Sequence, residues 1–133
     1  MATDDRSIAI IGAGRLGASL ADALLRAGYR LTHLAGRDLA AAAAVAAKLS
    51  VSVDVCSSEA AVSSADMVFL TVPDDAIEPV AAALPWRAEQ WAVHCSGASG
   101  PDVLSSATDA GAVAGCFHPL QSFPSREPDA RRF

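Results

Sequence analysis

The stretch Ser7–Leu20, which reads S-I-A-I-I-G-A-G-R-L-G-A-S-L, decides the fold of this chain. It opens with the apolar run Ile8–Ile11, whose length and β-branched side chains are typical of a buried strand. The run leads directly into the pattern G-x-G-x-x-G at residues 12–17, after which leucines recur at helical spacing. A strand, this glycine pattern and a helix in succession are the fingerprint of a dinucleotide-binding unit. The stretch therefore predicts a strand–turn–helix that binds a dinucleotide.

Each glycine of the pattern has its own expected role. Gly12 would make the tight turn, Gly14 would let a pyrophosphate approach bare backbone, and Gly17 would let the helix pack closely on the strand. The N–H groups of the first helical turn would face the phosphates, with the helix dipole adding to the attraction. We therefore expect cofactor contacts along the whole turn, from Gly12, Ala13, Gly14, Arg15, Leu16 and Gly17. The alternative is a glycine-rich turn between two core elements that holds no ligand.

Length and composition are typical of one domain with a hydrophobic core. The chain has 133 residues, of which 52% are hydrophobic, and its net charge is −5. Apart from the last few residues, no cluster of basic residues suggests nucleic acid, and no apolar run reaches the roughly 18 residues that span a membrane. The first six residues are polar and acidic, unlike a signal peptide. We expect a cytoplasmic protein with no nucleic-acid or membrane partner.

The three cysteines give no sign of a disulfide framework or a metal site. Cys56, Cys95 and Cys116 are odd in number and far apart in the sequence. We expect them to be reduced, buried, small hydrophobic residues, as in cytoplasmic proteins. No metal is therefore expected.

Strands alternate with helical patterns along the whole chain. The expected strands cover residues 7–11, 29–35, 51–55, 66–72, 91–95 and 111–117. This alternation predicts an α/β fold, with a doubly wound, mostly parallel six-stranded sheet of the Rossmann type and helices on both faces. The doubly wound pattern implies the strand order 3-2-1-4-5-6. In the second strand, Leu31, His33 and Ala35 are expected on one face.

The end of the second expected strand bears on which dinucleotide is bound. Domains that bind NAD place an acid there against the ribose hydroxyls, but this chain has Ala35 and Gly36. Arg37 follows, and its guanidinium suits the 2′-phosphate of NADP. Asp38 could serve as the acid if the strand ended late, although it is better placed to cap the next helix. We therefore predict NADP, with NAD as the less favoured cofactor.

A polar or glycine-rich turn follows the carboxyl end of five of the six expected strands. These turns lie at residues 12–17, 36–38, 72–75, 96–100 and 118–122. Ligands of doubly wound sheets bind outside these strand ends, so we expect the turns to form one site. Val72, Pro73 and Asp74 would pass beside the nicotinamide ribose. The carboxylate of Asp74 or Asp75 is expected to cap the following helix rather than to take part in chemistry.

Five stretches together resemble a known family. They are I-I-G-A-G-R-L-G (10–17), A-G-R-D (35–38), V-P-D-D-A-I (72–77), H-C-S-G-A (94–98) and F-H-P-L-Q-S-F-P (117–124). Residues 7–123 resemble the NADP-binding domain of bacterial proteins that pair it with a helical C-terminal domain of poorly defined function. These are relatives of the F420-dependent NADP oxidoreductases and pyrroline-5-carboxylate reductases.

The resemblance implies NADP binding and hydride transfer to a small keto or imine compound. It also implies that a helical domain completes the substrate site and builds a homodimer. On this reading residues 1–6 are a flexible tail, 7–123 the dinucleotide-binding domain, and 124–133 a linker or truncated tail. We expect a domain fragment that is inactive by itself.

Two polar side chains are the expected catalytic candidates. Ser96 and His118 follow the fifth and sixth expected strands, and His118 could donate a proton or orient a substrate carboxylate. A structural hydrogen bond at the strand end is the alternative role for His118. Gln121 and Ser122 could contact substrate or cofactor, whereas His94 is expected to be buried. With no clear acid–base group, a non-catalytic nucleotide-binding or sensor module remains an alternative function.

Overall fold

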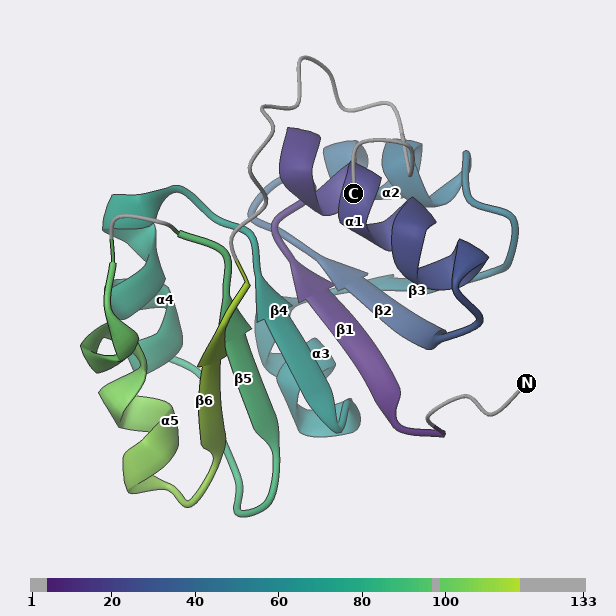
Figure 1. Ribbon diagram of the computed structural model, residues 1–133. Helices are drawn as coiled ribbons and strands as arrows, with labels where there is room; N and C mark the ends of the chain where they lie inside the picture. Colours follow the sequence, from purple (N-terminus) through teal and green to yellow (C-terminus); the bar gives the residue numbers. More distant parts are fainter. Residues whose placement is uncertain (1–4, 97–98, 118–133) are drawn as a thin grey trace.

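The computed structural model describes residues 5–96 and 99–117, which form one six-stranded sheet (Figure 1). Its strands are β1 (Ser7–Ile11), β2 (Arg30–Ala35), β3 (Asp54–Cys56), β4 (Met67–Leu70), β5 (Trp91–His94) and β6 (Val113–Cys116). The spatial order is β3-β2-β1-β4-β5-β6, and every neighbouring pair is parallel. The predicted Rossmann α/β fold and strand order are therefore confirmed.

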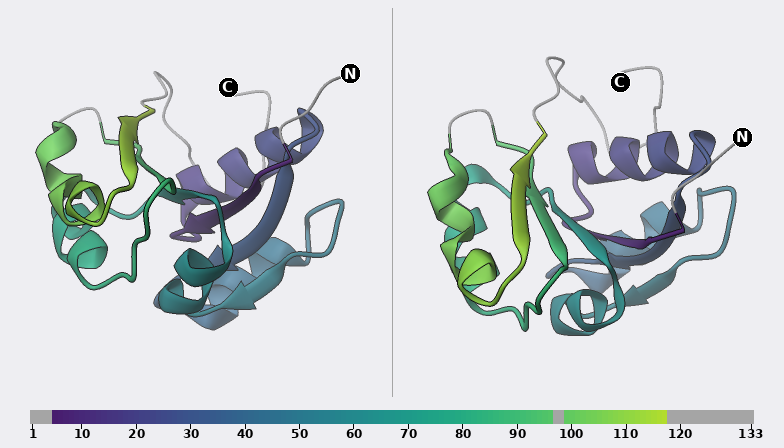
Figure 2. Two further views of the ribbon diagram at one scale, coloured as in Figure 1. Left: turned by 90° about the horizontal axis from the view of Figure 1, so that it is seen from below. Right: turned by 60° about the horizontal axis from the view of Figure 1, so that its bottom comes forward.

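A helical segment lies between each pair of consecutive strands. These segments are α1 (Arg15–Arg26), α2 (Leu39–Ala46), α3 (Ser58–Ser64), η1 (Asp74–Ala76) with α4 (Ile77–Ala82), and η2 (Pro101–Leu104) with α5 (Ser105–Asp109). Figure 2 shows α1 and α3 on opposite sides of β1, and α4 and α5 beside β5 and β6. Among the described helices, none is both long and apolar enough to cross a membrane.

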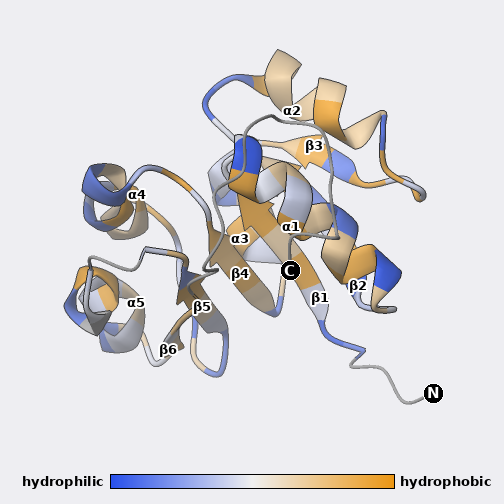
Figure 3. Ribbon diagram, turned by 45° about the horizontal axis from the view of Figure 1, so that its top comes forward, coloured by the Kyte–Doolittle hydropathy of each residue, from blue (hydrophilic) through white to orange (hydrophobic). Residues whose placement is uncertain are grey.

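Two hydrophobic clusters hold the helices to the sheet, one on each face. Ile8 and Ile10 point into the cluster that includes α1 and α2, while Ile11 and Leu70 point into the cluster that includes α3, α4 and α5. Figure 3 shows the hydrophobic residues gathered along β1 and β4, in the middle of the sheet. Because β1 is apolar on both faces, it can only be a central strand.

An irregularity in β2 corrects the predicted alternation of its side chains. Ile8 pairs with Leu31 but Ala9 pairs with His33, so Thr32 is an extra residue in the ladder. Leu31 consequently belongs to the cluster on the α1 face, whereas Ala35 belongs to the other cluster. The prediction that both lie on one face is wrong, because one inserted residue reverses the alternation.

The cysteines also differ from expectation. All three are free thiols, but only Cys95 is buried; Cys56 is partly exposed and Cys116 is exposed. Cys116 ends the edge strand β6, where no further described strand covers it.

The loop before β5 ties the end of α3 to the sheet. Gln90 is 1% exposed, and its amide Nε2 donates to the carbonyl oxygens of Val62 and Ala65 at 2.7 and 2.8 Å. Its Oε1 accepts from the backbone N–H of Arg87 at 3.2 Å, and the Arg87 guanidinium donates to the same two carbonyls. These side chains satisfy carbonyl groups that the end of a helix leaves without partners.

Replacing Gln90 with Leu should lower the free energy of unfolding by about 1–3 kcal/mol, because the Arg87 backbone N–H and the carbonyls of Val62 and Ala65 each lose a partner. Chemical denaturation monitored by circular dichroism measures the change. Ser63→Ala, at an exposed position of α3, is the control and should change the free energy by less than about 0.5 kcal/mol. Equal stability of the wild type and Gln90→Leu would contradict this role for Gln90.

Candidate functional site

The glycine turn leaves the carboxyl end of β1 and is fixed to its two neighbouring strands. Gly12 has a φ of +115°, a conformation that side-chain-bearing residues rarely adopt. Its backbone N–H donates to the carbonyl of Ala35, at the end of β2, over 2.7 Å. The turn therefore lies where the carboxyl ends of β1, β2 and β4 meet, as the sequence predicts.

Thr71 holds the other side of the turn, and the sequence reasoning missed it. Its backbone N–H donates to the Ile11 carbonyl at 2.9 Å, and its hydroxyl lies 3.1 Å from that oxygen and 2.7 Å from the Gly12 carbonyl. A Cβ on Gly12 would lie only 2.8 Å from the Thr71 hydroxyl oxygen. The one sequence signal is a hydroxyl residue at the end of an apolar strand, which gives no hint of a partner 59 residues away.

The other two glycines of the pattern have opposite surroundings. A Cβ on Gly17 would collide with the Gly12 carbonyl and also crowd the Thr71 hydroxyl, so the absence of a side chain lets α1 pack against the turn. A Cβ on Gly14 would meet nothing within 4 Å. The packing of α1 against the turn thus requires a glycine at position 17. At Gly14 no protein atom would contact a side chain, so the space beside this residue is open.

Two cavities lined by residues that the structure describes flank the glycine turn. The first, of about 420 Å³, is lined by fifteen residues, among them Gly12, Ala13, Gly14, Gly36, Arg37, Asp38, Ser58, Val72, Pro73 and Asp75. The second, of about 400 Å³, is lined by Gly14, Arg15, Leu16, Thr71, Val72, Pro73, Asp74 and Cys95. Since Gly14, Thr71, Val72 and Pro73 line both, the two cavities adjoin across the turn. Of the eleven expected cofactor-binding residues, all but Gly17 line a cavity.

In the segment after β2, Arg37 and Asp38 have different structural roles. β2 ends at Ala35, and a Cβ on Gly36 would lie 3.7 Å from the backbone nitrogen of Ala13 in the glycine turn. Asp38 caps α2, because its Oδ1 accepts from the backbone N–H of Ala41 at 3.1 Å. The predicted cap is confirmed, and the exposed Arg37 lines the first cavity beside the turn.

Asp74 and Asp75 do not cap a helix, contrary to expectation. The chain turns through η1 (Asp74–Ala76) before α4 starts, and neither element has a side-chain cap. The caps are Pro73 and Ala76, because the 3₁₀ turn places both carboxylates inside the first turn rather than before it. Asp74 and Asp75 each line one of the cavities.

Cys95 and Ser96, which directly follow β5, are buried. Ser96 is 3% exposed, its hydroxyl lies 3.2 Å from that of Ser99, and it does not line either cavity. Burial, with a smaller contribution from Cys116, raises the pKa of the Cys95 thiol to about 12. Cys95 therefore presents a neutral thiol to the second cavity and cannot act as a thiolate near neutral pH.

The predicted catalytic roles stay predictions. His118, Gln121 and Ser122 lie outside the described residues, so their positions relative to the cavities are not part of the structure. Ser96 is described, but its hydroxyl contacts that of Ser99 and it lines neither cavity.

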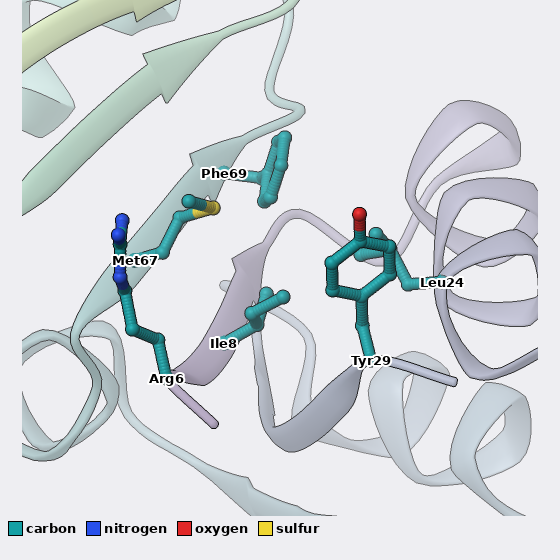
Figure 4. Close-up of a pocket in the computed structure, with 6 residues that line it drawn as sticks. All are labelled: Arg6, Ile8, Leu24, Tyr29, Met67 and Phe69. Atoms are coloured by element: carbon teal, nitrogen blue, oxygen red, sulfur yellow. The ribbon is translucent and has the colours of Figure 1, made fainter. Parts of the chain in front are cut away.

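A third hollow lies at the opposite, amino-terminal end of the sheet (Figure 4). It measures about 260 Å³ and is lined by Arg6, Ile8, Leu24, Tyr29, Met67 and Phe69. Tyr29 and Leu24 face Met67 and Phe69 across it. None of the expected site residues lines it.

Comparison with solved structures finds the same fold in larger proteins. A candidate NADP oxidoreductase from Bacteroides fragilis is 26% identical, with a TM-score of 0.72, over 94% of this chain and 48% of that protein. A reductive aminase from Aspergillus terreus, solved with NADPH and ethyl-5-oxohexanoate, is 17% identical, with a TM-score of 0.72, over 90% of this chain and 42% of that one.

An enzyme of gentamicin A biosynthesis in complex with NAD is 16% identical, with a TM-score of 0.68, over 86% of this chain and 35% of that one. The chain thus spans less than half the length of these proteins. No curated protein matches it. The family described as coenzyme F420-dependent NADP oxidoreductase matches residues 7–96. That match covers the glycine turn, Arg37 and both cavities, and the chain therefore belongs to the F420-dependent NADP oxidoreductase family.

Proposed function

We propose that this chain binds NADP(H) across the two cavities and serves as the cofactor-binding domain of a small-molecule oxidoreductase. The adenosine half would occupy the cavity at Arg37, and the nicotinamide half the cavity at Cys95. The pyrophosphate would lie between them, against Gly14. Family membership and the adjoining cavities support this arrangement.

The glycine turn fits a pyrophosphate. Gly14 precedes α1, and no side chain or backbone atom would meet a Cβ there within 4 Å. The helix begins without a side-chain cap and has no acidic residue in its first turn. Its first N–H groups are therefore available to phosphate oxygens, and no carboxylate of α1 opposes them.

Arg37 is the observation that carries the preference for NADP. It lines the cavity two residues after β2 ends, where a domain specific for NAD would place an acid. The nearby carboxylate of Asp38 is committed to the α2 cap through one of its oxygens. A guanidinium at this position would make charge-assisted hydrogen bonds to the 2′-phosphate.

The proposed reaction is hydride transfer between the cofactor and a small keto or imine compound. When bound, the nicotinamide supplies the hydride. Val72 and Pro73 would form an apolar wall that excludes water from its ribose, and the neutral Cys95 thiol would line the same cavity without competing as a nucleophile. His118 or Ser96 would handle the substrate proton, and a further domain would complete the substrate site and the homodimer.

Replacing Arg37 with Ala should weaken NADPH binding by about 10- to 100-fold, the loss expected for charge-assisted hydrogen bonds. NADH binding should change by less than about twofold, because NADH has no 2′-phosphate. Isothermal titration calorimetry with both cofactors measures the two dissociation constants.

Asp38→Asn is the matched control for Arg37→Ala. Asparagine keeps the α2 cap, so NADPH should bind this variant at least as tightly as the wild type. If Asp38→Asn instead weakened NADH binding while Arg37→Ala changed neither affinity, Asp38 would be the ribose-binding acid and the NADP proposal would fail.

The two glycine substitutions should separate fold from cofactor binding. Gly14→Ala should leave the free energy of unfolding within about 0.5 kcal/mol of the wild type but weaken NADPH binding about tenfold or more, because its methyl group would occupy the pyrophosphate position. Gly17→Ala should destabilise the fold by about 1–3 kcal/mol through overpacking. Thermal unfolding with and without NADPH measures both effects. Unchanged NADPH affinity in Gly14→Ala would place the pyrophosphate elsewhere.

A further inference from the structure

His94 is a buried imidazole that bridges the turn following β5. It is the last residue of β5 and is 0% exposed. Its Nδ1 lies 3.1 Å from the backbone nitrogen of Ser96, and its Nε2 lies 3.2 Å from the carbonyl oxygen of Gly100. One side chain therefore holds both the start and the end of this turn.

These two partners determine where the imidazole proton lies. A backbone N–H can only donate and a carbonyl oxygen can only accept, so Nδ1 must be the acceptor and Nε2 must carry the hydrogen. Both ring nitrogens are satisfied only in this neutral tautomer. Both ring nitrogens are thus engaged by backbone groups of the turn.

The turn that His94 holds borders the second cavity. Cys95, between His94 and Ser96, lines that cavity together with Arg15 and Asp74. The Cys116 thiol donates to the Ser96 carbonyl at 3.5 Å, a contact that adds a second tie from β6. The first cavity, at Arg37, has no lining residue from this turn.

We propose that His94 is a positioning residue that holds the β5 turn, and with it Cys95, against the nicotinamide half of the cofactor. The inference rests on the proposed NADP(H) binding. His94 lines neither cavity, so it acts only through the backbone of the turn. Its loss should therefore affect ligands that reach the second cavity and spare ligands confined to the first.

Three substitutions of His94 test the contributions of its two hydrogen bonds separately. In His94→Asn the side-chain oxygen reaches the position of Nδ1 and can accept from Ser96, while in His94→Gln the amide nitrogen reaches the position of Nε2 and can donate to Gly100. His94→Leu keeps neither bond. Calorimetry gives the affinity of each variant for NADPH and for 2′,5′-ADP, which contains only the adenosine half with its 2′-phosphate.

We expect His94→Leu to weaken NADPH binding about tenfold while 2′,5′-ADP binding stays within about twofold of the wild type. Asn and Gln should each restore part of the NADPH affinity. Equal losses for both ligands, or no loss for either, in folded variants would overturn the inference alone. A wild-type protein that binds neither ligand would overturn the NADP(H) proposal as well.

A measurement on the wild type keeps the inference testable if the variants fail to fold. The ¹⁵N chemical shifts of the His94 ring should report the Nε2–H tautomer, and they should move when NADPH binds but not when 2′,5′-ADP binds. An Nδ1–H or doubly protonated ring, or equal responses to the two ligands, would contradict the positioning role.

Discussion

The close packing of the glycine turn against Thr71 is the constraint on which the site depends. The Thr71 hydroxyl lies within hydrogen-bond distance of two carbonyls, those of Ile11 and Gly12, while Gly17 brings α1 against the same point. Side chains at Gly12 or Gly17 would separate β1, β4 and α1 exactly where their ends converge. No room for a side chain remains between the glycine turn, Thr71 and α1. The space at Gly14, in contrast, is open and lies where the two cavities adjoin.

Short polar contacts then shape the two cavities independently. On one side, Asp38 is held by the α2 backbone and leaves Arg37 exposed at the cavity. On the other, His94 holds the turn that carries Cys95, whose burial raises the pKa of the thiol to about 12. The first cavity therefore has the Arg37 guanidinium at its wall, and the second has the protonated Cys95 thiol beside Arg15 and Asp74.

The sequence predicted the features that depend on local pattern. The central strand β1, the glycine turn, the Asp38 cap and the strand order follow from apolar runs, glycine spacing and alternation. Features that depend on the exact path of the backbone, nearby or far along the chain, were missed. The bulge at Thr32 reversed the face of Leu31, and the 3₁₀ turn kept Asp74 and Asp75 from capping α4. The roles of Thr71, Gln90 and His94 appear only when backbone groups elsewhere are in place.

We propose that NADP(H) lies on the glycine turn at the carboxyl ends of the strands. Selective ¹⁵N-glycine labelling gives nine amide signals, some at the site and others far from it. Titration with NADPH should shift the signals of Gly12, Gly14, Gly17 and Gly36, while Gly28, which follows α1, and Gly111, which precedes β6, stay in place. Shifts at Gly28 or Gly111 without shifts in the glycine turn would contradict the account.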